Sequence, residues 1–422
     1  MNNSFMRYKM GELCRIKHGY PFQGEYFSDE GKYIILTPGN FYEQGGFKRI
    51  AGKEKFYLGD VSEEYICKKG DLIVAMTEQA EGLLGSTALV PEDDLYLHNQ
   101  RIGLIFPEND LVDKLFLYYL FMTKSVRKRL RGSSSGTKVK HTSPEKIYDV
   151  EVWIPKIKDQ RSIALLLYNI DKKIDINNKI NDNLQQQAKL LYDYWFTQFD
   201  FPDVNGNPYK ASGGQMVWDE NLKREIPFGW TSKSIINNPL VTVLKPGVDV
   251  FDRKTYLATA EVNGTSISTG NVVEYATRES RANMQPTVNS VWFAKMKNSI
   301  KHLFLNEEMI SLINSSILST GFCGLQCTEK SFEYISSFIG YSYFETIKDT
   351  LAHGATQEAV NNDDLDGVFM VIPDDKTLSL YHDATKCIYA KISKNICENQ
   401  ELVGLKDWLL PMLMNGQVTV TD

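Results

Sequence analysis

An internal repeat constrains the fold of this chain more than any other feature of its sequence. The segment VEVWIP at residues 150–155 returns as VFMVIP at residues 368–373, an offset of 218 residues. The same offset holds without a gap as far as the pair Leu191 and Leu409. A match of this length indicates duplication of a whole structural unit. The sequence therefore predicts two copies of one plan, each a strand-rich globular domain followed by a long helix.

Weaker matches extend the repeat towards the start of each copy. They set residues 72–76 opposite 292–296, and residues 99–105 opposite 321–327. Short β-branched runs bounded by Gly or Pro predict strands at residues 32–39, 71–77, 101–107 and 368–373. One further helix per copy is predicted, at residues 110–131 and 328–351.

The two long helices carry a heptad seam, in which apolar residues and asparagines recur in alternating steps of four and three. Because two asparagines occupy the same relative places in each seam, we expect them to bond across it and to set the register. At the weak position Lys406 we expect Leu405 to substitute. Two unrelated surface helices are the alternative. The predicted seam residues are Ile170, Ile174, Asn177, Asn181, Leu184, Leu191, Ile388, Ile392, Asn395, Asn399, Leu402 and Leu409.

These patterns predict an α+β fold with a pseudo-twofold internal repeat, in which two similar mixed α/β domains are separated by two long antiparallel coiled-coil helices. Antiparallel packing would place the domains at opposite ends of the helix pair. The predicted parts are a first domain (1–155), a central helix (156–200), a Pro- and Gly-rich linker loop (201–229), a second domain (230–373) and a C-terminal helix (374–416).

Composition narrows the class of protein. No apolar run approaches the roughly 18 residues that span a bilayer, and the N-terminus lacks a signal peptide, so no membrane partner is expected. Six cysteines in such a chain suggest free thiols in a reducing cytoplasm. The pair Cys323 and Cys327, with His302 or His353, lacks the ligand spacing of a metal site, and no metal is expected. We find no nucleotide-binding, hydrolase or metalloprotease motif, which disfavours an enzyme acting alone.

The net charge of -6 argues against a nucleic-acid partner, but the local charge argues for one. A first basic run surrounds a Gly/Ser cluster at residues 132–136, and a second lies between residues 253 and 301. Basic side chains beside a flexible loop suit a phosphate backbone, and Arg and Asn also read base edges. The predicted DNA-binding residues are Lys124, Arg127, Lys128, Arg129, Arg131, Lys138, Lys140, Arg278, Arg281, Asn283, Lys295 and Lys297.

With these features together, the chain resembles the DNA-specificity subunit of type I restriction–modification enzymes along essentially its whole length. The resemblance is carried by IPKIKDQRSIALLLYNIDKKI at residues 154–174, by residues 183–199, by the linker and IPFGW at 226–230, and by LAHGATQEAV and LKDWLLPMLMNG in the second half. The second copy lacks the pair Asp159 and Gln160, so any subunit contact of that pair would differ between the copies.

The resemblance implies a non-catalytic cytoplasmic subunit for phage defence. Each domain would read one half of a bipartite, asymmetric site in double-stranded DNA, and the helices would act as a ruler. It also implies two methyltransferase subunits and restriction/translocase subunits as partners. These partners would bring S-adenosylmethionine, ATP and Mg, with no cofactor in this chain. Two alternatives stay open: the recognition subunit of a related bipartite-site nuclease–methyltransferase, and a coiled-coil scaffold without DNA.

Overall fold

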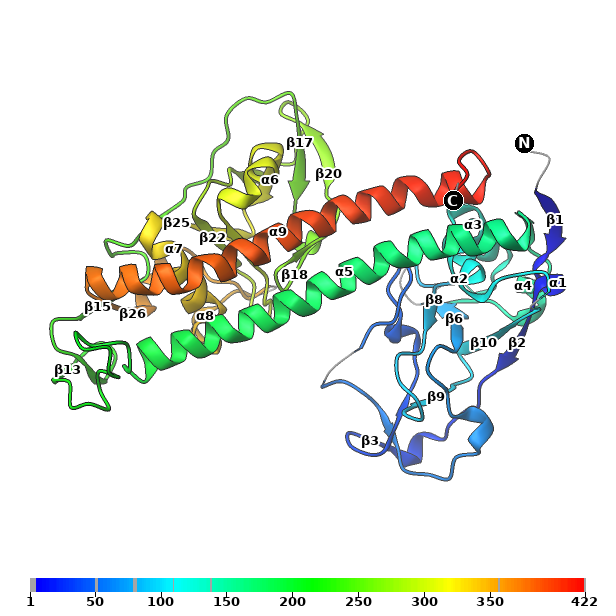
Figure 1. Cartoon of the computed structure of the whole chain (residues 1–422), viewed down its shortest axis with the longest axis horizontal. Helices are drawn as coiled ribbons and strands as arrows, with labels where there is room; N and C mark the ends of the chain where they lie inside the picture. Colours follow the sequence, from blue (N-terminus) through cyan, green and yellow to red (C-terminus); the bar gives the residue numbers. More distant parts are fainter. Residues whose placement is uncertain are drawn as a thin grey trace. The chain divides into compact units, whose positions relative to one another are not determined.

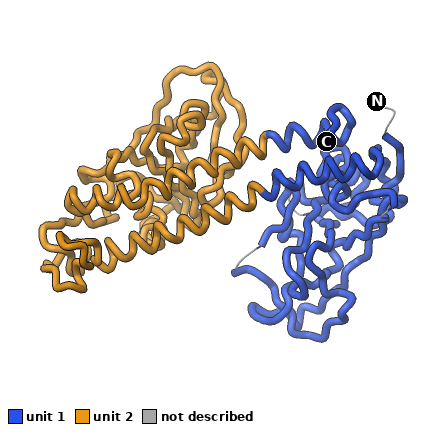
Figure 2. The backbone as a smooth tube through the Cα atoms, viewed as in Figure 1, with its two compact units in different colours: residues 1–172, 405–422 blue, residues 173–404 orange. Residues whose placement is uncertain are grey.

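The computed structural model describes residues 5–49, 52–78, 82–108, 110–136, 139–355 and 357–420. The chain forms two compact units, residues 1–172 with 405–422, and residues 173–404 (Figure 2). The helices α5 (Ile157–Tyr192) and α9 (Asp375–Met414) each contribute to both units. The predicted α+β class with two long helices is confirmed (Figure 1).

The first unit is built on an antiparallel sheet with the strand order β2-β10-β6-β8. All four residues of β6, LIVA, are buried, as expected for a central strand covered on both faces. A separate ladder pairs the first strand, β1, with the last, β12. The bounds are β1 (Met6–Lys9), α1 (Met10–Leu13), β2 (Cys14–His18), β3 (Phe27–Ser28), β4 (Tyr33–Ile35), β5 (Phe56–Tyr57), β6 (Leu72–Ala75), β7 (Thr77–Glu78), β8 (Thr87–Leu89), β9 (Tyr96–Leu97), β10 (Ile102–Pro107), α2 (Lys114–Met122), α3 (Lys124–Ser133), β11 (Lys140–His141), α4 (Pro144–Tyr148) and β12 (Glu151–Ile154).

The second unit repeats this plan with the sheet order β16-β25-β22-β23 and a β15–β26 ladder of first and last strands. β26 lies 218 residues after β12, so the predicted offset is a structural one. The bounds are β13 (Met216–Asp219), β14 (Arg224–Pro227), β15 (Thr231–Ser234), β16 (Val241–Val243), β17 (Arg253–Leu257), β18 (Val262–Asn263), β19 (Ser266–Ile267), β20 (Asn271–Glu274), β21 (Ala282–Met284), β22 (Ser290–Ala294), β23 (His302–Leu305), α6 (Ile310–Ser315), β24 (Ser316–Ser319), β25 (Phe322–Cys327), α7 (Phe332–Gly340), α8 (Ser342–Leu351) and β26 (Phe369–Ile372).

The single helix predicted in each domain is in fact two. α2 and α3 are interrupted at Thr123, and α7 and α8 at Tyr341, again 218 residues apart. Both residues adopt extended backbone angles, and the Thr123 hydroxyl accepts a hydrogen bond from Val126 N as the N-cap of α3. The helical periodicity continues across the break, which is why the sequence pattern missed it.

The predicted upstream alignment of the two copies was wrong by one or two residues. Met76 O accepts a hydrogen bond from Thr142 N, and Lys295 O accepts the corresponding bond from Val360 N. Met76 is thus equivalent to Lys295, whereas the sequence match set it opposite residue 296. Likewise, β10 and β25 align with an offset of 220, because Ile102 faces Ala75 and Phe322 faces Ala294. Uniformly apolar strands provide no landmark for register, and a slip of one residue exchanges the faces.

All twelve predicted seam residues are buried or half-buried. In the second unit, Asn177 Nδ2 donates to Asn399 Oδ1 at 2.9 Å, and Asn395 Nδ2 donates to Asn181 Oδ1 at 2.8 Å. These pairs run in opposite directions along the chain, so α5 and α9 are antiparallel there. Asn399 Nδ2 also donates to Asn178 Oδ1 at 2.8 Å.

In the first unit the seam position Lys406 is not replaced by Leu405, which contradicts the prediction. Leu405 is exposed, while the Lys406 ammonium lies 2.6 Å from Asp171 Oδ1. Asp171 also accepts a hydrogen bond of 2.7 Å from the Tyr119 hydroxyl. A lysine is tolerated in the seam because its charge is paired with Asp171.

The segment predicted as a linker loop contains an ordered hairpin. β13 pairs with β14 over four residue pairs. Phe201 stacks between Tyr209 and Trp230, with ring centroids 4.7 and 4.6 Å away. Phe201 and Trp230 belong to the hydrophobic core of the second unit, and Tyr209 packs against it, so the aromatic stack anchors this segment to that core.

Candidate nucleic-acid interface

The first basic run forms α3 and the loop after it. Lys124, Lys128 and Arg129 are exposed on this helix. Lys124 and Lys128 are one turn apart and therefore lie on the same face. The Arg129 guanidinium donates to the backbone oxygen of Glu151, at the start of β12. This exposed face is available to an external anion.

Arg127, although predicted to bind DNA, points inward and holds backbone segments together. Its guanidinium donates to the carbonyl oxygens of Gly82 (2.8 Å), Leu84 (3.2 Å), Glu43 (2.9 Å) and Phe121 (3.2 Å). Burial lowers the pKa of Arg127 to about 10, an effect that the nearby Glu78 opposes. Because these donors are occupied inside the domain, we no longer include Arg127 among the predicted DNA contacts.

Glu78 forms the other half of this arrangement. Its buried carboxylate accepts hydrogen bonds from Gly82 N (3.1 Å) and Leu84 N (2.9 Å), and Arg131 Nε lies 3.5 Å from it. We call Arg127, Arg131 and Glu78 the first clamp, because together they bind both the carbonyls and the amides of the loop between β7 and β8. Half-buried Lys140 is the ladder partner of Glu78. Lys138 lies outside the described residues.

In the second domain, Arg281 and Lys295 border the turn between β24 and β25. Arg281 O accepts a hydrogen bond from Thr320 N (2.8 Å), and Lys295 N donates to Gly321 O (3.0 Å). The Arg281 side chain is exposed and has no hydrogen bond or ion pair within the described residues. Lys297, two residues beyond Lys295, is paired with Glu358 at 2.8 Å. Arg281 and Lys295 border the same turn, and Lys297 follows two residues after Lys295; we call these three residues the basic rim.

Arg278 and Asn283, unlike Arg281, are held within the domain or partly covered. The Arg278 guanidinium stacks over the Tyr275 ring at 4.0 Å and donates to the oxygens of Tyr275 and Ala282. It thereby shapes the loop that presents Arg281. Asn283 is half-buried on β21.

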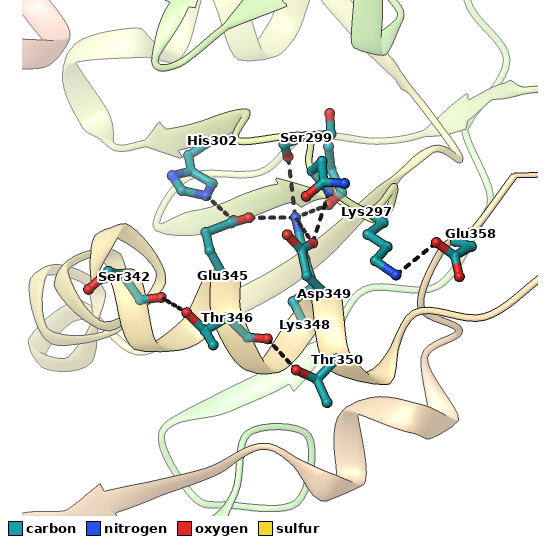
Figure 3. Close-up of polar contacts among 12 residues, drawn as sticks. Lys297, Ser299, His302, Ser342, Glu345, Thr346, Lys348, Asp349, Thr350 and Glu358 are labelled. Carbon is teal, nitrogen blue, oxygen red and sulfur yellow. Dashed lines mark hydrogen bonds and ion pairs between the residues drawn. The ribbon is translucent and has the colours of Figure 1, made fainter. Parts of the chain in front are cut away.

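A second clamp surrounds the loop between β22 and β23 (Figure 3). The fully buried Lys348 ammonium lies 2.6 Å from Glu345 Oε2 and donates to Ala294 O (3.4 Å) and Ser299 O (3.3 Å). Glu345 also pairs with His302 Nε2 at 2.8 Å, and Asp349 accepts from Asn298 N at 3.1 Å. Burial opposes ionisation of Glu345, but the contacts with His302 and Lys348 outweigh it and lower its pKa. The second clamp is Glu345, Lys348, Asp349 and His302.

The two clamps occupy equivalent helix positions with reversed charge. Arg127 corresponds to Glu345 and Arg131 to Asp349 at the offset of 218. Sequence reasoning missed Glu78 and the whole second clamp. The signal was available, because aligning α3 with α8 at this offset places charge opposite charge at both positions. Basic residues alone do not reveal it, because the second helix carries acidic residues at both positions.

The cysteines and helices add no further site. Cys323 and Cys327 are buried free thiols on β25, and burial raises the pKa of Cys323 to about 12. Among the described residues, no three His, Cys, Asp or Glu side chains are grouped to hold a metal ion. Within the same residues, no helix combines the length and apolar character needed to cross a membrane.

Comparison with known proteins identifies the chain's relatives. Residues 2–186 match the family described as Type I restriction modification DNA specificity domain. The sequence is 24% identical to the Type I restriction enzyme MjaIX specificity subunit of Methanocaldococcus jannaschii, over 77% of this chain and 73% of the relative. It is 21% identical to the HindI specificity subunit of Haemophilus influenzae, over 83% and 87%.

The fold is also similar to a solved structure. The crystal structure of the type I restriction–modification S subunit from M. genitalium matches with a TM-score of 0.54 at 14% identity, covering 98% of this chain and 97% of the other. Residues 2–186 are thus similar to a DNA specificity domain, and most of the chain is similar to specificity subunits of type I restriction–modification enzymes.

Proposed function

We propose that this chain is the non-catalytic subunit that reads a bipartite, asymmetric site in double-stranded DNA, with one half-site for each domain. The observation that carries the proposal is the repetition of one scaffold with different loops. Both domains use the same sheet order and the same helix pair, whereas equivalent loop positions differ in charge, with Lys140 in the first domain and Glu358 in the second. Two domains with the same sheet and helix pair but different loops are suited to recognise two different half-sites.

The rim formed by Arg281, Lys295 and Lys297 is the proposed contact of the second domain. For the first domain we propose Lys124, Lys128 and Arg129 of α3, with Lys140. Cations at a loop edge neutralise phosphates, which makes affinity fall steeply as salt rises. A coiled-coil scaffold without DNA would show no such salt dependence.

The helix pair is the proposed spacer and assembly surface. Its asparagine pairs favour one register, so the helices can act as a ruler. We propose that two methyltransferase subunits and restriction/translocase subunits assemble with this chain, and that these partners bring S-adenosylmethionine, ATP and Mg. Methylation and cleavage would then belong to the partners.

The test is methylome sequencing of cells with and without this gene. We expect one modified bipartite motif, with two dissimilar halves and a constant spacer, to disappear when the gene is removed. In parallel, the assembled complex should bind a duplex of that motif with a steep salt dependence. The proposal would be overturned if no modified motif disappeared with the gene. It would also be overturned if the affinity of the complex for the duplex did not depend on salt.

A further inference from the structure

The loop between β22 and β23, residues 295–301, carries two of the three residues of the basic rim, and its shape is set by buried charges. Lys348 donates to the carbonyls of Ala294, the last residue of β22, and of Ser299 in the loop, and Asp349 accepts from the Asn298 amide. Asn298 has a φ of +56°, a conformation that L residues rarely adopt without support. The loop is therefore held from α8 at both ends and at its tightest point.

The buried ionic network is costly to assemble, which makes a purely packing role a poor explanation. Lys348 is fully buried, and its counterpart Leu130 in the first domain is an apolar residue that is also fully buried. An apolar side chain therefore fills this place in one copy of the scaffold. Buried ion pairs are often no more stabilising than apolar residues of similar volume, and their better attested use is to specify one arrangement.

The first domain reaches the same result with the charges reversed. There Arg127 holds the carbonyls of Gly82 and Leu84, while Glu78 holds their amides. In the first domain Glu78, which precedes the clamped residues, is the ladder partner of Lys140, and in the second domain Met296 of the clamped loop is bridged to Ala359. Two different sets of charges thus fix the equivalent loop, as expected if its shape is what matters.

We propose that the second clamp is a positioning device, in which Glu345, Lys348 and Asp349 hold loop 295–301 in the shape that recognises the second half-site. The first clamp does the same for the first half-site. This inference rests on the proposed function. None of the clamp residues needs to touch DNA, so they are positioning residues rather than contacts.

The test compares Lys348→Met with Lys330→Met, an exposed lysine of the same domain, in the full chain assembled with its partner subunits. Hydrogen exchange is measured first without DNA. We expect the amides of residues 295–301 to exchange about tenfold faster or more in Lys348→Met, and those of residues 82–86 to be unchanged. Binding is then measured to duplexes altered in one half-site at a time.

We expect Lys348→Met to reduce discrimination at the second half-site about tenfold and to leave discrimination at the first intact. Arg127→Met should reduce discrimination at the first half-site and leave it intact at the second. Lys330→Met should leave discrimination at both half-sites unchanged. A merely structural role would weaken binding to all duplexes equally. If Lys348→Met does not fold, Glu345→Gln, which retains the shape, replaces it.

Faster loop exchange with unchanged discrimination at both half-sites would overturn the positioning role, as would unchanged exchange in a folded variant. Failure of the proposed function is a separate outcome. In that case the unmodified protein itself would bind no duplex in a salt-dependent way, whatever the loop exchange shows.

Discussion

Asn395 donates a 2.8 Å hydrogen bond to Asn181 Oδ1 across the α5–α9 seam, where the exposed fraction of Asn181 is 5% and that of Asn395 is zero. Replacing one asparagine leaves the buried amide of the other without its hydrogen-bond partner. We expect Asn395→Leu to lower the free energy of unfolding by about 1–3 kcal/mol. The double variant Asn181→Leu/Asn395→Leu should recover about 1 kcal/mol or more of this loss, because an apolar pair leaves nothing unsatisfied.

Urea unfolding of the four proteins in this mutant cycle measures the coupling. Gln186→Leu, at an exposed position of α5, is the control and should change little. Additive losses in the double variant would show that the two amides do not interact.

The exposed Arg281 side chain predicts a loss confined to one half-site. We expect Arg281→Ala to weaken binding to the full site by about 1–3 kcal/mol. A duplex with a scrambled second half-site should bind the variant and the unmodified protein equally. Fluorescence anisotropy with the two duplexes checks this, with Lys330→Ala as the matched exposed cation. Equal weakening on both duplexes would contradict a base contact and leave only a phosphate contact.

Gly136 and Gly354 are equivalent glycines whose backbone angles exclude a side chain. Their φ values are +97° and +139°, and an added Cβ would lie 2.0 Å from Val139 O and 2.4 Å from Gln357 O. We expect Gly136→Ala and Gly354→Ala each to cost about 1–3 kcal/mol, and each to impair its own half-site. Thermal unfolding and half-site binding test this. Gly132→Ala, with open space around the added Cβ, should be neutral or slightly stabilising.

The asparagine pairs make a matched deletion in the two helices possible. Removing residues 176–182 and 394–400 together takes one heptad and both seam asparagines from each helix. We expect the preferred DNA spacer to shorten by about 3 base pairs, since seven residues of helix span roughly 10 Å. Deleting only residues 176–182 should destabilise the protein, because Asn395 and Asn399 lose their partners. Methylation mapping reports the spacer, and an unchanged spacer in the matched variant would refute the ruler.

His98 gives the first domain a predictable pH response. It is fully buried, its Nε2 donates to Ile102 O at 2.9 Å, and burial lowers its pKa from 6.5 to about 4. Because the folded pKa is depressed, the neutral ring's contribution is complete above pH 6.5 and is lost as pH falls towards 4. The loss amounts to about 3 kcal/mol.

Urea unfolding between pH 7 and pH 4.5 measures this response. We expect His98→Met to flatten the pH dependence relative to the unmodified protein. The exposed His141 provides the control variant, His141→Gln, which should retain the full dependence. An identical pH profile for His98→Met would exclude the buried ring as the cause.

The repeat, the seam and the family resemblance were readable from sequence because each depends on spacing along the chain. The offset of 218 pairs β12 with β26 and Thr123 with Tyr341, and the seam asparagines lie four residues apart in both helices. Local patterns of this kind can be recognised in a sequence without any knowledge of tertiary contacts. Helix breaks and the alignment of buried strands were misjudged, because an apolar run looks the same on either side of a break and in either register.

The role of each charged side chain was decided only by tertiary structure. Arg127 and Lys124 belong to one basic run, yet Arg127 is turned towards the carbonyls of Gly82 and Leu84 while Lys124 faces outward. Glu345 acquires a partner in His302, which comes from a strand more than 40 residues earlier in the chain. Sequence spacing settles which residues share a helix or a seam. What a charge does depends on the backbone groups that distant segments bring beside it, because burial and hydrogen bonding determine its energy.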